Sequence, residues 1–142
     1  MARHTTHFED PRGGNLAAAL RTRVKGRFAG EAVVELLISL CGWLARRGFV
    51  AVAIAGGRDG VTGRAVAWTG WEAALAALNA GGLACGTSEA KVLAIAASIA
   101  AGLPVTLGQM MSGLDERTAV AVAGAVLHAA GHRDLLVRRG AR

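Results

Sequence analysis

The chain has 142 residues, of which 53% are hydrophobic and 18% charged, and it contains 20 glycines and no tyrosine. This length supports one hydrophobic core rather than two. The longest apolar stretches, residues 32–45 and 92–103, are shorter than the roughly 18 residues that a membrane-spanning helix needs. The N-terminal segment is polar and lacks the apolar core of a signal peptide. We therefore expect one domain, in the cytoplasm, without membrane association.

The net charge of +6 comes from the two ends of the chain. Residues 1–28 carry six basic and two acidic side chains, residues 133–142 carry four and one, and the rest has a net charge of −1. Such basic ends either solubilise a protein or bind nucleic acid or an acidic protein surface, with an affinity that falls as salt rises. The candidate contact residues are Arg21, Arg23, Lys25, Arg27, Arg133, Arg138 and Arg139.

The chain divides into three parts. We expect a flexible basic arm at residues 1–14, a globular domain at residues 15–132 and a basic C-terminal tail at residues 133–142. A first helix follows the arm, and Gly26 and Gly30 predict a bend or break after it.

A second helix is predicted from Glu31, because apolar residues recur there at steps of three and four. Arg46 and Arg47 suit the carboxyl end of that helix, and Gly48 is a suitable residue to end it.

The hydrophobic period then changes from 3.6 to two, which predicts a β-hairpin from Val50 to Trp68 around the turn signal Asp59-Gly60. We expect an odd-length loop with Gly60 in the left-handed conformation. That register places the large side chains of both strands on one face of the hairpin.

Polar start signals precede the remaining helices. The predicted capping residues are Thr69 with Glu72, Thr87 or Ser88, Thr106 with Gln109, and Asp115. The sequence therefore predicts an α+β fold, a mostly helical single domain of about five helices with one central β-hairpin.

His128 and His132 are four residues apart, the spacing at which two imidazoles on one helical face can bind zinc. Gly131 lies between them after a run of helix formers and is the natural end of the last helix. His132 would then lie outside the helix, and His128 would interact with the helix dipole in the last turn. We therefore interpret both histidines as weak metal candidates only, and we expect no cofactor.

Cys41 and Cys85 are too far apart in the sequence for a metal-binding or redox motif, so we expect two free thiols. Cys41 falls on an apolar helical face and is predicted to pack in the core. Cys85 directly precedes a helix start, where unpaired N–H groups can stabilise a thiolate. It is the one weak candidate for a catalytic residue, because the sequence identifies no base beside it.

Two other motifs are excluded. The glycine-rich residues 55–64 lack the spacing of phosphate-binding loops and lead into a strand rather than a helix. Residues 88–130 resemble a helix-turn-helix in outline, but the predicted helix at 116–130 has one arginine and no lysine. That helix lacks the side chains that read base edges, so we expect it in a core or a subunit interface.

Two classes of function remain. We favour a small non-catalytic accessory protein that self-associates as a homo-oligomer and contacts nucleic acid or an acidic partner through its arginine-rich ends. Such a protein would suit a role beside DNA-handling machinery. The alternative is a small enzyme or ligand-binding protein that uses Cys85 with a histidine or an arginine.

Overall fold

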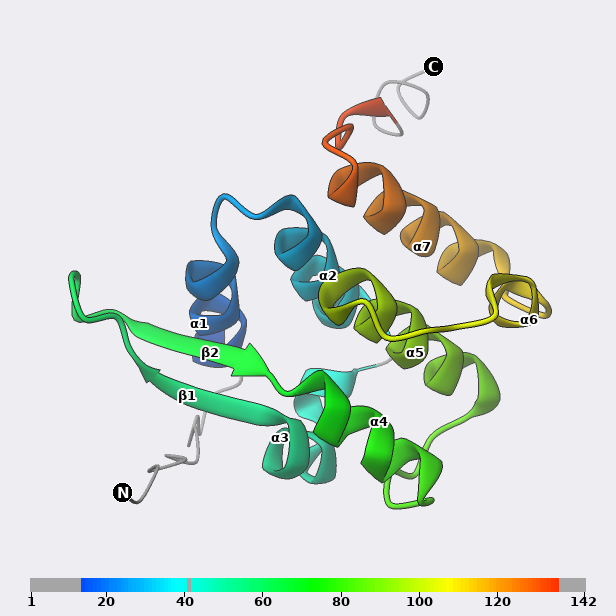
Figure 1. Cartoon of the computed structure of the whole chain (residues 1–142), viewed down its shortest axis with the longest axis horizontal. Helices are drawn as coiled ribbons and strands as arrows, with labels where there is room; N and C mark the ends of the chain where they lie inside the picture. The colour runs from blue at the N-terminus through cyan, green and yellow to red at the C-terminus, as the bar shows by residue number, and fades with distance from the viewer. Residues whose placement is uncertain (1–13, 41, 136–142) are drawn as a thin grey trace.

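The computed structural model describes residues 14–40 and 42–135. They form a mostly helical α+β domain with one two-stranded antiparallel sheet (Figure 1), as the sequence predicts. No helix in these two ranges has the length and apolar character needed to cross a bilayer. The elements in chain order are α1 (Gly14–Val24), α2 (Phe28–Ser39), the 3-10 helix η1 (Trp43–Ala45), α3 (Arg47–Ala53), β1 (Ile54–Arg58), β2 (Ala65–Thr69), α4 (Trp71–Asn79), α5 (Thr87–Ala101), α6 (Leu107–Met111) and α7 (Glu116–Ala129).

The helix α2 lies at the centre of the domain, where α1, α5 and α7 all pack against it (Figure 1). Its sequence, FAGEAVVELLIS, is apolar on most of its circumference, so it has to be covered from several sides. The buried residues of α2 are Ala32, Val33, Val34, Leu36 and Leu37.

The break between α1 and α2 falls where the glycines predict it. The chain turns at Gly26, which has φ +87°, and α2 begins at Phe28. Gly30 has a different role, because it lies inside α2 and faces the end of α1. A Cβ atom at Gly30 would come within 2.9 Å of the Val24 side chain, so glycine permits the close approach of these helices.

Two predictions are wrong: the single helix from Glu31 to Gly48, and the hairpin strand that begins at Val50. The helix α2 ends at Ser39, Gly42 adopts a left-handed conformation with φ +60°, and α3 continues to Ala53 before β1 begins. Gly48 thus lies within a helix instead of ending one. The rearrangement brings Trp43 and Phe49 together in the core.

The rings of Trp43 and Phe49 are fully buried, with their centroids 5.3 Å apart and their planes tilted by 53°. The guanidinium of Arg46 lies 4.4 Å from the centre of the Trp43 ring and pairs with the carboxylate of Glu89 on α5. This cation–π contact and ion pair connect η1 to α5. Tertiary packing of the two rings therefore overrides the local periodicity that predicted a longer helix and a longer strand.

The hairpin has an even-length loop, so the predicted odd-length loop is wrong. Asp59 N–H donates to the Arg64 carbonyl at 2.8 Å, which leaves four residues in the turn, and Gly63 rather than Gly60 has a positive φ of +70°. Trp68 pairs with Ala55 across the sheet, so a large side chain lies opposite a small one.

The carboxylate of Asp59 determines the conformation of this turn. It accepts hydrogen bonds from the N–H groups of Val61 and Thr62, at 2.7 and 2.9 Å. These bonds hold the pKa of Asp59 below its ordinary value. The hydrogen bonds to this acidic residue at the start of the turn thus fix the loop length. The expected placement of the large side chains on one face of the hairpin does not.

Asp115 caps α7 as predicted, because its carboxylate accepts the N–H of Thr118 at 2.7 Å. The starts of α4 and α5 differ from prediction, since their N-caps are Gly70 and Gly86. The predicted capping residues Thr69, Thr87 and Ser88 flank these glycines, and Thr106 is an N-cap without a side-chain capping bond.

Gly131 ends α7, which confirms that part of the prediction. It has φ +87°, its N–H donates to the His128 carbonyl at 2.9 Å, and the N–H of His132 donates to the Leu127 carbonyl at 2.7 Å. These two bonds form the usual glycine-based helix ending. The ring of Phe28 packs directly beneath, 3.3 Å from where a Cβ atom of residue 131 would lie.

Replacing Gly131 by alanine should destabilise the fold by about 1 kcal/mol or more, because it combines a left-handed backbone with a tight contact. Gly48→Ala is the matched control, since that glycine is helical and a Cβ there meets no atom within 4 Å. Urea unfolding should show a lower midpoint for Gly131→Ala and an equal or higher midpoint for Gly48→Ala. Equal midpoints for the two variants would contradict this account of the helix end.

Candidate functional site

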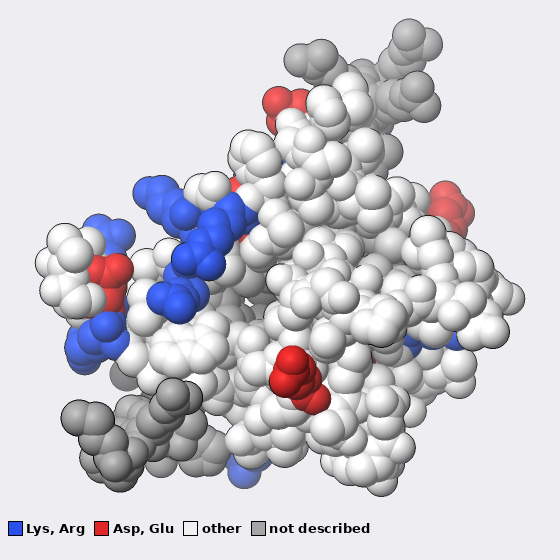
Figure 2. All heavy atoms as spheres, viewed as in Figure 1, with Lys and Arg blue, Asp and Glu red and all other residues white. Residues whose placement is uncertain are grey.

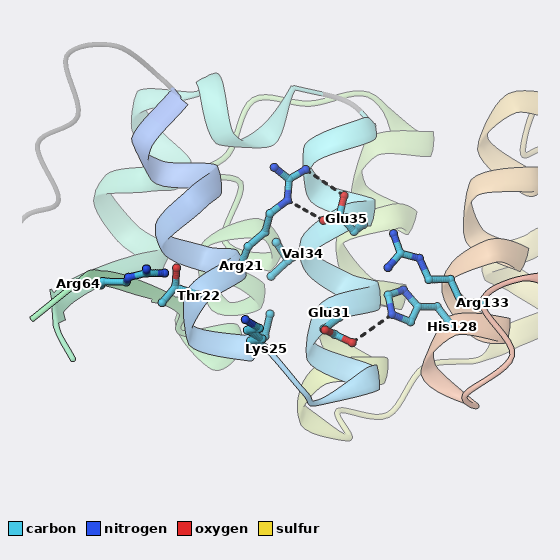
Figure 3. A pocket seen from close by; sticks show the side chains of 10 residues that line it. Arg21, Thr22, Lys25, Glu31, Val34, Glu35, Arg64, His128 and Arg133 are labelled. Atoms are coloured by element: carbon cyan, nitrogen blue, oxygen red, sulfur yellow. Dashed lines mark hydrogen bonds and ion pairs between the residues drawn. The ribbon is translucent and has the colours of Figure 1, made fainter. Parts of the chain in front are cut away.

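The structure brings three of the predicted basic residues to one surface hollow of about 280 Å³ (Figure 3). Arg21 and Lys25 come from α1, and Arg133 follows the end of α7. Arg64 from the hairpin joins them, in addition to the contact residues predicted at the two ends of the chain. Segments that are far apart in the sequence therefore contribute positive charge to one place.

The other predicted contact residues do not line the hollow. The guanidinium of Arg23 lies 5.3 Å from the centre of the Trp68 ring on β2. Arg27 is the exposed N-cap residue of α2. Arg138 and Arg139 lie outside the described residues, as do most of the expected N-terminal arm and C-terminal tail.

Arg21 is held by Glu35 on α2. Its Nε and Nη2 atoms donate to the two carboxylate oxygens at 2.7 and 3.2 Å. The hydrogen bond from Arg21 holds the pKa of Glu35 below its ordinary value, against the opposing effect of partial burial. The positive charges of Arg21 and Arg133 act in the same direction as that bond.

His128 is buried in the last turn of α7, and its Nε2 atom lies 3.3 Å from Oε1 of Glu31 on α2. The other oxygen of Glu31 accepts the N–H of Gly26 at 3.3 Å. Glu31 thus connects α7, α2 and the turn after α1, and His128 has a partner that is not a metal ion. This contact explains the burial of a polar side chain at the end of α7.

The two histidines are not brought together on one helical face. Gly131 turns the chain after α7, and His132 is exposed beyond it. Within residues 14–40 and 42–135, no group of three metal-ligating side chains is close enough to hold an ion. The geometry therefore does not support either histidine as a metal ligand.

The hollow has a surplus of positive charge. Four cationic side chains line it, whereas its two carboxylates already contact Arg21 and His128. Lys25 and Arg64 form no side-chain hydrogen bond or ion pair with another described residue. Lysine and arginine side chains also gather over the hairpin and the α1–α2 connection in Figure 2, beside a largely uncharged surface. The arrangement is therefore suited to bind an anion.

Cys85 lies in a separate groove of about 580 Å³, lined by residues of α4, α5 and α6. The groove contains Leu78, Leu83 and Met110, and the cationic Lys91 beside it donates to the Ser112 carbonyl. No histidine or arginine is among its lining residues in the described chain. Arg46 comes close to this segment, because it donates a hydrogen bond to the Ala84 carbonyl at 2.9 Å, next to Cys85. Cys41 lies outside the described residues.

The sequence analysis missed Glu31 and Glu35 as organisers of this site. Their spacing of four residues puts both carboxylates on one side of α2, which is a readable signal. Their partners could not be read from the sequence, because His128 is 97 positions from Glu31. The hollow arises only when α1, α7 and the hairpin pack around α2.

Comparison of the chain with protein-family models, curated proteins and solved structures finds no match. A fold by itself does not define a function, since one fold can carry many. The evidence on function is therefore the chemistry of the hollow and its surroundings.

Replacing Arg21 by methionine should raise the pKa of Glu35, because the substitution removes its hydrogen bond and a positive charge. A carboxylate whose pKa is lowered on folding stabilises the fold above its unfolded pKa and loses that contribution as the pH falls. Titration of the Glu35 carboxyl carbon by NMR should show the midpoint moving upward in Arg21→Met.

Arg117→Met is a control for this titration, since Arg117 is exposed at the start of α7 and does not line the hollow. It should leave the Glu35 midpoint unchanged. The same Glu35 midpoint in the wild type and in Arg21→Met would contradict the assigned cause.

Proposed function

We propose that the protein is a non-catalytic interaction module that binds a phosphate-bearing polymer, with nucleic acid as the favoured partner. One observation carries this proposal: Lys25 and Arg64 converge on one hollow without a described carboxylate paired to either. A guanidinium group matches the geometry of phosphate oxygens, and an ammonium group adds a point charge. Arg21 is paired with Glu35 and keeps guanidinium N–H donors that the carboxylate does not use.

An exposed aromatic ring beside the basic surface favours nucleic acid over an acidic protein. Trp68 is 40% exposed on β2, with the Arg23 guanidinium over its ring. Arg23 directly follows Thr22, which lines the hollow. Bases of single-stranded nucleic acid stack on such rings, while basic side chains contact the backbone.

Binding of this kind would be largely independent of base sequence. The helix α7 offers only Arg117 and no lysine, so it lacks a reading surface for a DNA groove. Affinity would come from phosphate contacts and counterion release, and it would fall steeply as salt rises. Among the described residues Cys85 is a free, partly buried thiol, which suits a reducing compartment and supports an accessory role in the cytoplasm.

We also propose that the protein forms a homo-oligomer. The support is the solvent side of α7, where Val120 and Val126 are 57% and 52% exposed. Large apolar side chains that are exposed on one helix can be covered by a partner.

Lys25→Ala and Arg64→Ala should each weaken binding of a single-stranded oligonucleotide several-fold, measured by fluorescence anisotropy at low salt. Each change removes one phosphate contact, so the slope of log affinity against log salt should become shallower by about 0.7. Arg47→Ala is the matched control. It removes the same charge from an exposed position on α3 outside the hollow, and it should change little.

Three results would contradict the proposal. An effect of Arg47→Ala equal to that of Arg64→Ala would show that net charge, not the hollow, governs binding. A wild-type protein that binds no oligonucleotide at low salt would remove the proposed function. Tighter binding of poly-glutamate than of the oligonucleotide would exclude nucleic acid as the favoured partner.

A further inference from the structure

His128 is a buried histidine in the wall of the basic hollow. It lines the hollow from the last turn of α7, and its ring packs beside the ring of Phe28, with the two centroids 6.5 Å apart. Histidine is the side chain whose charge ordinarily changes between pH 5 and 8. Among the described residues that line the hollow, His128 is the only histidine. Its protonation therefore changes the charge of the site near neutral pH.

The contact between His128 and Glu31 can persist in both charge states of the imidazole. Nε2 of His128 lies 3.3 Å from Oε1 of Glu31, and an ionised carboxylate only accepts hydrogen bonds. Nε2 therefore carries a proton and donates it to this bond in the neutral ring as well as in the cation. The second oxygen of Glu31 accepts the N–H of Gly26, which holds the carboxylate in place. Protonation at Nδ1 thus adds a charge without breaking the contact.

Protonation of His128 makes the hollow more positive by one charge. Four cations and two carboxylates line it, so its net charge is +2 when His128 is neutral and +3 when His128 is protonated. Figure 3 shows His128 and Arg133 on the opposite wall from the cations of α1. An anion in the hollow therefore meets the imidazole side as well as those cations. The charged lining residues are Arg21, Lys25, Arg64, Arg133, Glu31 and Glu35.

The charged groups around His128 that do not line the hollow leave this change in place. On α5, which packs against α7, Glu89 pairs with Arg46, and Lys91 donates to the Ser112 carbonyl. The other charged or titratable groups on α1, α7 and the segments that follow these helices are exposed outside the hollow. They are Arg23, Arg27, Glu116, Arg117, His132 and Asp134.

We propose that protonation of His128 strengthens anion binding in the hollow, so that the affinity for a phosphate-bearing polymer rises as the pH falls from 8 to 6. This regulation rests on the proposed function and acts on that same site. The coupling between two bound species is reciprocal. An anion in the hollow therefore raises the proton affinity of His128 by the same factor by which the proton raises the affinity for the anion.

Binding of oligo(dT) at pH 6 and pH 8, measured by fluorescence anisotropy at one low salt concentration, tests the coupling on a polymer. The phosphodiesters and thymine bases of this probe keep their charge over that range. The wild type should bind about threefold or more tightly at pH 6, because the hollow gains one charge close to the phosphates. His128→Gln, whose amide can still donate to Glu31, should lose most of this difference.

His132→Gln is the matched control for the binding experiment. That histidine is exposed beyond the end of α7 and does not line the hollow, so this variant should respond to pH like the wild type. Thermal unfolding of both variants at the two pH values checks that they are folded.

NMR titration of the His128 ring in the wild type tests the coupling without a substitution. The titration midpoint should be higher in sulfate than in chloride of equal ionic strength, because sulfate is a dianion whose charge is constant over this range. The midpoint of the exposed His132 should differ less between the two salts.

The outcomes separate the pH coupling from the proposed function. Equal pH responses of the wild type and His128→Gln would overturn the coupling, and so would the same His128 midpoint in sulfate and in chloride. If the wild type binds no oligo(dT) at either pH while sulfate raises the His128 midpoint, the polymer-binding function fails and the coupling of His128 to an anion in the hollow stands.

Discussion

The burial of α2 is the constraint on which the rest of the molecule depends. This helix exposes so little polar surface that it is stable only when α1, α5 and α7 cover it. The close approach of α1 is possible because residue 30 is glycine. Covering α2 fixes the positions of segments that begin and end far apart in the sequence. The basic hollow is a direct consequence, because it lies where α1, α2, the hairpin and the end of α7 meet.

The few polar side chains that α2 retains organise that hollow. Glu31 and Glu35 lie on its partly exposed edge and contact His128 and Arg21. These contacts satisfy the carboxylates and orient α1 and α7, so they serve stability and positioning at once. They also remove the acidic groups as competitors for the remaining cations. The positive charge that the hollow offers to a ligand therefore depends on how the two carboxylates of α2 are paired. It does not depend only on the number of arginines at the ends of the chain.

Features with a local cause could be predicted from the sequence, and features with a distant cause could not. Asp115 and Gly131 mark the two ends of α7 through bonds to their own neighbours, and both were predicted. The break after Ser39 depends on the packing of Trp43 against Phe49, which the local period does not show. For the site, composition indicated the basic ends, but the meeting of Arg64 with α1 requires the hairpin register and the packing of β2 on that helix.

The basic hollow uses only the inner side of α7. His128 points toward α2 and belongs to the wall of the hollow, whereas Ala123 on the other side of the helix is exposed. The contacts of Glu31 with His128 and of Glu35 with Arg21 involve no residue of that outer side. Self-association would therefore change the number of anion sites that meet one polymer without changing the chemistry of each. This separation follows from a helix whose inner side carries the only buried histidine among the described residues, while its outer side carries small apolar residues.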